Sequence, residues 1–135
     1  MPTQRQVRIN SLLQEEISRI LLLELQDPEL RLVSITGVVV SPDLRNAKVY
    51  ASVMADDDEQ IWAALAALMR NRKRIQSLIA HNVILRQTPR LRFVADRTAA
   101  NAQRIETLLG KIAQEPPLPD APEDEAPLYD LDQGE

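Results

Sequence analysis

Apolar residues at helical spacing mark the first predicted element of the chain. Between about Arg5 and Gln26 they recur every three or four positions, while charged residues occupy the opposite face. The apolar stripe consists of Ile9, Leu12, Leu13, Ile17, Ile20 and Leu21. Asp27-Pro28 follows, and a proline disfavours helical backbone in the residue before it. The pattern predicts one amphipathic helix that ends at Asp27.

Two segments typical of strands follow this helix. Val33 to Ser41 is rich in β-branched residues, and Ala47 to Met54 alternates small or β-branched side chains with larger or polar ones. Between them, Ser41-Pro42-Asp43 has the composition of a turn. We expect an antiparallel hairpin in which one face of the two strands is buried.

An Ala/Leu-rich segment predicts the next helix. The acidic run 56–59 before it suits helix capping better than a metal site, because a calcium loop needs alternating ligands and a glycine. Beyond Met69 the apolar spacing slips across the basic run 70–74, then resumes over Ile75 to Ile79. We therefore expect a helix break near Asn71 that leaves the basic residues exposed.

The last part of the pattern contains one strand and one helix. Leu91 to Ala95 alternates after Pro89, and we expect Thr98 to cap a helix that ends between residues 110 and 114. The full order is helix–strand–strand–helix–helix–strand–helix. It predicts an α+β fold with one three-stranded sheet and helices packed on one face.

Composition changes abruptly at Glu115. Residues 115–135 contain eight acidic residues and five of the nine prolines, without any Lys or Arg and without apolar periodicity. We expect an acidic, proline-rich disordered tail there and one folded domain over residues 1–114. The net charge of −4 therefore combines a domain at +4 with a tail at −8.

The composition also removes most enzyme classes that short motifs identify. The chain has no cysteine, and its three glycines are too far apart to form a phosphate-binding loop or a Gly-x-x-Gly clamp. A single histidine, His81, does not indicate a catalytic centre. We expect no catalytic residue, metal, cofactor or small-molecule substrate. No signal peptide or membrane-spanning run is visible, so we expect a cytoplasmic protein.

The strongest functional signal is a basic segment from Arg70 to Arg97. It carries eight Arg or Lys residues and one acid, Asp96, which gives a charge of +7. Many cations on one face are what binding to phosphates requires, although a run of charge is also typical of a plain solvated surface. Few aromatic residues are present to stack on bases. The segment therefore favours backbone and shape contacts with structured RNA.

A second hypothesis is a protein–protein module. In that interpretation the Ala-rich helix from Trp62 to Met69 forms a dimer seam, with Trp62 either an exposed anchor or a core residue. A stable dimer that ignores RNA would favour this module. For the RNA-binding hypothesis we expect a monomer.

An ordered set of short segments resembles the bacterial ribosome-binding factor A family over roughly residues 5–110. The matching segments are Asp27-Pro28-Glu29-Leu30, Val33 to Leu44, Ala47-Lys48-Val49-Tyr50, Ile75 to Ile79, Leu85 to Phe93 and Asp96. The resemblance implies a KH-type (type II) domain that binds the small (30S) ribosomal subunit and its immature 16S rRNA during late maturation. It further implies release once assembly is complete and a link to growth in the cold.

The resemblance also implies where RNA is bound. The family usually breaks its central helix at an Ala-x-Gly element, and the matching residues here are Asn71, Arg72 and Lys73. Without glycine we expect a shallower break, although asparagine tolerates left-handed backbone, and the change adds charge at the RNA-facing site. The RNA-binding residues carried over in this way are Arg70, Arg72, Lys73, Arg74, Arg86, Arg90 and Arg92.

Overall fold

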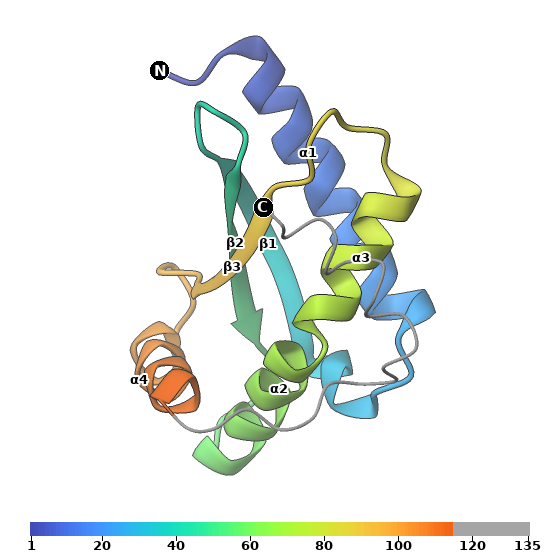
Figure 1. The fold of residues 1–135 in the computed structure, drawn as a ribbon. Helices are drawn as coiled ribbons and strands as arrows, with labels where there is room; N and C mark the ends of the chain where they lie inside the picture. Colours follow the sequence, from blue (N-terminus) through green and yellow to red (C-terminus); the bar gives the residue numbers. More distant parts are fainter. Residues whose placement is uncertain (115–135) are drawn as a thin grey trace.

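The computed structural model describes residues 1–114, which form a three-stranded mixed sheet with helices around it (Figure 1). In chain order the elements are α1 (Gln4–Arg19), the π-helical turn η1 (Ile20–Glu24), the 3-10 helix η2 (Pro28–Leu32), β1 (Val33–Val40), β2 (Asn46–Val53), α2 (Asp58–Arg70), α3 (Arg72–Asn82), β3 (Arg90–Ala95) and α4 (Ala102–Gln114). With the two short helices η1 and η2 added, this order confirms the predicted α+β fold.

Helix α1 begins with a reciprocal cap and ends in a change of helix type. The Thr3 hydroxyl accepts the N–H of Gln6 at 3.1 Å, and the Gln6 side chain accepts that of Thr3 at 2.9 Å. The chain then continues as η1. Arg19, the last residue of α1, forms ion pairs with Glu16 and with Glu24 of η1, each at 2.6 Å. The predicted first helix is therefore correct in position, but its last turn is wound differently.

The sheet has the order β1-β2-β3, in which β1 is antiparallel and β3 is parallel to β2. This confirms the predicted hairpin. Alternation along β2 places Val49 and Ala51 on the buried face, while Lys48 is exposed on the opposite face. We call these the core face and the outer face of the sheet.

One carboxylate holds the turn between β1 and β2. Asp43 accepts hydrogen bonds from the Ser41 hydroxyl at 2.6 Å and from the Arg45 N–H at 3.0 Å. These two bonds, the hydroxyl first, lower the pKa of Asp43. Leu44 takes a φ of 62°, in the left-handed region that costs an L-residue roughly 1–2 kcal/mol. Its side chain packs against the core, which offsets that cost.

Helices α1, α2 and α3 cover the core face. Ile9, Leu13 and Ile17 of α1 pack in one cluster with Ile75 and Ile79 of α3 and with the buried residues of the strands. Full burial of a side chain of this size contributes about 1.5–3 kcal/mol. The apolar pattern selects these α1 residues correctly, but Leu12, which it also selects, is exposed at 42% because it lies at the edge of the stripe.

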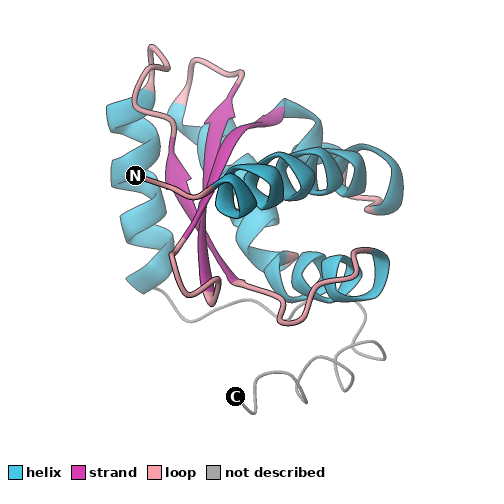
Figure 2. Ribbon diagram, turned by 90° about the horizontal axis from the view of Figure 1, so that it is seen from above, coloured by secondary structure: helices cyan, strands magenta, loops and turns pink. Residues whose placement is uncertain are grey.

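Helix α4 lies apart from this layer. Both views place it across the strands from α1 and α3 (Figures 1 and 2). Its Ile105 and Leu108 pack with α2 and with Val53 and Ala95, at the ends of β2 and β3, in a second core cluster. Helix α4 therefore extends the domain past the strand ends and borders the outer face.

The long helical segment breaks at Asn71, as predicted. Helix α2 begins after its N-cap, Asp57, whose carboxylate accepts the N–H of Gln60 at 2.7 Å. It ends at Arg70, and α3 begins at Arg72, with Asn71 between them at φ −96° and ψ 6°. This backbone is not left-handed, so the break requires neither glycine nor the left-handed tolerance of asparagine.

The start of α4 corrects the sequence prediction. Thr98 does not cap the helix; its N–H and its hydroxyl donate to the Asp96 carboxylate in the turn after β3. Asn101, just before the helix, donates to the carbonyls of Val53 and Ala55, both at 3.0 Å. Threonine has the same preference for turns as for helix caps, which is why the pattern places the helix start too early.

Two further expectations concern the end of the chain and its relation to membranes. The predicted tail, residues 115–135, lies outside the described residues. Among residues 1–114, no helix combines the length and the apolar character needed to cross a membrane.

Candidate RNA-binding surface

Like charges lie side by side on the outer face of the sheet. Lys48 of β2 and Arg92 of β3 are partners in the parallel register, and both side chains are exposed. Arg90, two residues earlier on β3, is exposed on the same face. Like charges opposite each other destabilise a sheet, and an anion bound between them would relieve the repulsion.

These cations line a groove of about 820 Å³ beside β3, which we call the β3 groove. Its basic lining residues are Lys48, Arg72, Arg90, Arg92 and Arg97. Glu106 of α4 is the acid among the described residues that line it. A concave surface with this excess of positive charge focuses its field on an incoming anion.

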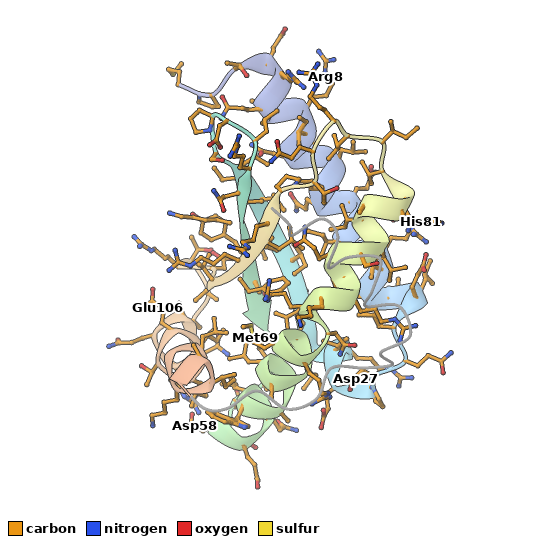
Figure 3. The ribbon with its side chains drawn as sticks, viewed as in Figure 1. Arg8, Asp27, Asp58, Met69, His81 and Glu106 are labelled. Atoms are coloured by element: carbon orange, nitrogen blue, oxygen red, sulfur yellow. The ribbon has the colours of Figure 1, made fainter. Side chains whose placement is uncertain are left out.

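Three parts of the fold line the β3 groove. Met69 and Arg72 come from the α2–α3 junction, and Leu109 and Ala113 come from α4. Residues of β2 and β3 lie between these two walls. Figure 3 shows Met69 on α2 and Glu106 on α4. Because β3 is an edge strand of the described sheet, the groove lies where β3 has no further strand beside it.

One side chain fixes two of these parts relative to each other. Gln76 of α3 accepts the N–H of Leu91 at 3.0 Å, and its amide donates to the carbonyl of Pro89 at 2.5 Å. Both bonds join α3 to the start of β3. They fix the backbone of α3, which carries Arg72, relative to the start of β3, which carries Arg90.

Asp96, the one acid of the basic segment, is hydrogen-bonded within the turn that follows β3. Asp96 accepts the N–H of Thr98 at 3.0 Å and its hydroxyl at 2.8 Å. These bonds, the backbone N–H first, lower the pKa of Asp96 and keep it ionised in the turn after β3. Asp96 is not among the residues that line the β3 groove.

Arg70 has a different environment from the groove arginines. Its guanidinium lies 2.5 Å from the Asp27 carboxylate and 3.6 Å from that of Glu29. Asn71, with only 4% of its surface exposed, donates to the same Asp27 oxygen at 3.1 Å and to the Ala67 carbonyl at 2.8 Å. Asp27, labelled in Figure 3, thus joins the helix break to the segment after α1. Arg70 contributes to the fold.

The structure brings three of the seven predicted RNA-binding residues into the β3 groove. These are Arg72, Arg90 and Arg92. The remaining four lie outside its lining: Arg70 in the ion pair with Asp27, Lys73 and Arg74 in the first turn of α3, and Arg86 in the loop before β3. The RNA-binding hypothesis therefore depends mainly on residues of β3 and of the elements that line the groove with it.

Two basic residues of the groove, Lys48 and Arg97, were not predicted from the sequence as RNA-binding residues. Strand alternation places Lys48 on the outer face, but nothing in the sequence indicates that Arg92 is its partner in the sheet. Arg97 belongs to the basic segment, yet no pattern singles it out. The usable signal is the alternation of Lys48 and Tyr50 with buried neighbours in β2.

The chemistry available in the groove is charge and shape. Tyr50 lines it as a half-buried ring, whereas Phe93, which also lines it, is buried with 6% of its surface exposed. One accessible ring stacks at most one base, so base stacking contributes little here. Within residues 1–114 no group of three or more acidic or histidine side chains is placed to hold a metal ion.

One face of the Ala-rich helix from Trp62 to Met69 is used inside the domain. Its Ala64, Leu65, Ala67 and Leu68 are completely buried. Trp62 is half-buried against the second core cluster. For the protein–protein alternative, the helix therefore leaves only the half-buried Trp62, Ala63, Ala66 and Met69 for a dimer seam.

Comparison with known proteins places these features in one family. The sequence model described as ribosome-binding factor A matches residues 5–109 of the chain. The ribosome-binding factor A of Thermomicrobium roseum is 44% identical over 115 residues, which cover 85% of this chain and 88% of that protein. The one from Rhodopirellula baltica is 36% identical over 115 residues, covering 85% and 83%.

Solved structures agree with the sequence relatives. The crystal structure of ribosome-binding factor A from Thermus thermophilus is similar with a TM-score of 0.59 and 26% identity, over 70% of this chain and 98% of that one. A homology model of the Thermus thermophilus ribosome-binding factor A, fitted into a cryo-electron-microscopy map of a 30S complex with this factor, has a TM-score of 0.54 and 28% identity, over 66% of this chain and 92% of that one. The chain shares the KH-like fold of these proteins.

Proposed function

The chain belongs to the ribosome-binding factor A family, and we propose that it binds the small (30S) ribosomal subunit through immature 16S rRNA during late maturation. It acts by binding, and no bond is made or broken. The relative from Thermus thermophilus, a homology model of which was fitted into a map of a 30S complex with this factor, supports the choice of subunit.

The observation that carries the proposal is the β3 groove. Five cations from the α2–α3 junction, the two strands and the turn after β3 converge on one concave surface with a single acid among its described lining residues. Each cation that contacts a phosphate releases a counterion, which favours binding to a dense polyanion. The adjacent Lys48 and Arg92 repel each other until a phosphate lies between them.

The shape of the surface favours folded RNA. With Tyr50 as its one accessible ring, the groove has little means to stack successive unpaired bases. It has instead cations from several elements at fixed relative positions, and this arrangement suits the phosphates of a structured RNA. Residence in the cytoplasm and a role in growth in the cold complete the proposal, both on the strength of family membership.

The test is co-sedimentation with separated small and large ribosomal subunits over a salt series from about 0.05 to about 0.5 M potassium chloride. We expect retention on small subunits only, falling steeply with salt. The double variant Lys48→Glu/Arg92→Glu should lose about a hundredfold in affinity at about 0.1 M salt, because two cations become repulsive.

A matched control reverses the same number of charges elsewhere. Arg5 and Arg8 are exposed on α1, and Figure 3 shows Arg8 near the start of that helix, away from α4. The variant Arg5→Glu/Arg8→Glu should keep most of the affinity. Equal losses in both variants would show a general charge effect and reject the β3 groove. Equal binding to both subunits would reject the small subunit as the specific target.

We also propose that the free protein is a monomer. Sedimentation velocity at several concentrations should show one species near the chain mass of 15.2 kDa. A concentration-dependent dimer would return the interaction-module hypothesis to consideration. Its contact surface would then have to lie outside the buried face of α2.

A further inference from the structure

The β3 groove and the acidic tail, residues 115–135, have opposite charges, and α4 leads from the groove to the start of the tail. The groove has five basic lining residues and Glu106, whereas residues 115–135 have eight acids and no base. We propose that the tail of this chain occupies the β3 groove when RNA is absent and is displaced only by a polyanion dense in phosphate. This inference rests on the proposed function for its biological role, although the contact itself can be measured without RNA.

The position of α4 makes the contact intramolecular. Leu109, Gly110 and Ala113, all in the last two turns of α4, line the groove. The helix ends at Gln114, so the tail starts next to the wall of the groove. Twenty-one further residues follow. Fully extended, they reach up to about 70 Å, far more than is needed to cross a surface of this size.

A tether this short keeps the local concentration of tail carboxylates in the millimolar range, because each encounter with the groove is intramolecular. The acids are at Glu115, Asp120, Glu123, Asp124, Glu125, Asp130, Asp132 and Glu135. They add counter-charge for the adjacent Lys48 and Arg92, which share the groove with one acid, Glu106, among its described lining residues. Attraction of this kind is strong at low salt and is screened as the Debye length shrinks.

The consequence is selectivity. A ligand with few phosphates cannot displace eight tethered carboxylates, whereas a folded RNA that contacts the whole groove gains more by counterion release than the tail supplies. The tail thus lowers affinity for incidental nucleic acid more than affinity for the proper target. It does so without any change in the folded domain.

The contact is tested directly in the full-length chain, which has no native cysteine. A single Ala126→Cys substitution carries a nitroxide spin label, and paramagnetic broadening of backbone amide signals reports which residues the tail visits. We expect broadening at Lys48 and Arg92 at about 0.05 M salt that disappears at about 0.5 M salt. It should also disappear in the background Arg90→Glu/Arg92→Glu, observed at Lys48.

Broadening confined to the end of α4, or unchanged by salt and by the groove substitutions, would overturn the inference. This outcome is independent of ribosome binding. If the tail contact is present but small subunits are not retained, the proposed function fails and the tail contact stands. If subunits are retained but the contact is absent, only the inference fails.

A second measurement uses matched charge neutralisation. Glu123→Gln/Asp124→Asn/Glu125→Gln changes the tail, and Glu15→Gln/Asp56→Asn/Glu59→Gln changes the same residue types at exposed positions of the domain. Fluorescence anisotropy with a short generic RNA duplex at about 0.05 M salt should show about threefold tighter binding for the tail variant only. Equal tightening in both variants, or in neither, would contradict a tail that competes for the groove.

Discussion

Arg70 and Arg92 are the same residue type in one basic segment, yet the structure gives them opposite surroundings. Arg70 lies 2.5 Å from Asp27 and 3.6 Å from Glu29. Arg92 has Lys48 as its partner in the neighbouring strand. The first arginine finds its counter-charge within the domain, whereas the second lies beside a like charge on the outer face of the sheet.

The difference between the two arginines shows what a run of positive charge leaves open. Within the run, every arginine contributes equally to a charge of +7. Which of them is available to a ligand depends on acids that lie far away in sequence and close in space. The predictions that follow measure this division between cations that hold the fold and cations that bind RNA.

The largest effect should come from Arg70→Glu. The substitution removes the pair with Asp27 and places a third carboxylate beside Asp27 and Glu29. We expect the free energy of unfolding in urea to fall by about 2–3 kcal/mol. Arg70→Met, which removes the charge without adding repulsion, should cost less. RNA affinity per folded molecule should change little, and a large loss of affinity with unchanged stability would place Arg70 among the binding residues.

Arg92→Glu should give the reverse result. Its exposed guanidinium leaves the outer face of the sheet, so the free energy of unfolding should stay within about 0.5 kcal/mol of the native value. Affinity for small subunits should fall about tenfold at moderate salt, with a shallower salt dependence. The comparison breaks down if Arg92→Glu unfolds the domain or leaves binding intact.

Asn71→Ala examines the helix break that lies beside Arg70. The substitution removes the donors to Ala67 and Asp27 from a buried position. We expect a loss of about 1–2 kcal/mol in unfolding free energy, measured by urea denaturation. Alanine can adopt the backbone dihedral angles of Asn71, so the helix break itself should persist. The amide chemical shifts of α2 and α3 would then remain those of two separate helices. A continuous helix through residue 71 would contradict this account.

The smallest effect concerns Arg19, which is paired like Arg70 but is more exposed. Its hydrogen bond to Glu16 is the main cause of the lowered pKa of Glu16. A lowered folded-state pKa stabilises the fold above the unfolded-state pKa, and this contribution is lost as pH falls through the folded-state pKa. Carboxyl NMR titration should place the Glu16 pKa below its usual value, and Arg19→Gln should return it upward. An unchanged pKa in Arg19→Gln would remove Arg19 as the cause.

Arg70 and Arg92 also differ in how much of their surroundings could be predicted from the sequence. The alternation along β3 is enough to put Arg90 and Arg92 on the outer face, because a strand that buries Leu91 and Phe93 exposes the residues next to them. The slip in apolar spacing after Met69 correctly indicated the helix break. The pairing of Arg70 with Asp27 was not predictable, because the two residues meet only once α2 packs beside the segment after α1.

The sequence by itself determined the order of elements, the buried faces of α1 and β2, and the presence of a basic surface. These follow from local periodicity and local charge, which are properties of neighbouring residues. Only the tertiary structure decided that Lys48 lies beside Arg92, that α4 forms a wall of the β3 groove and that Arg70 is paired. Strand register and helix placement are set by packing between distant segments, and electrostatic interactions depend on the distances that this packing creates.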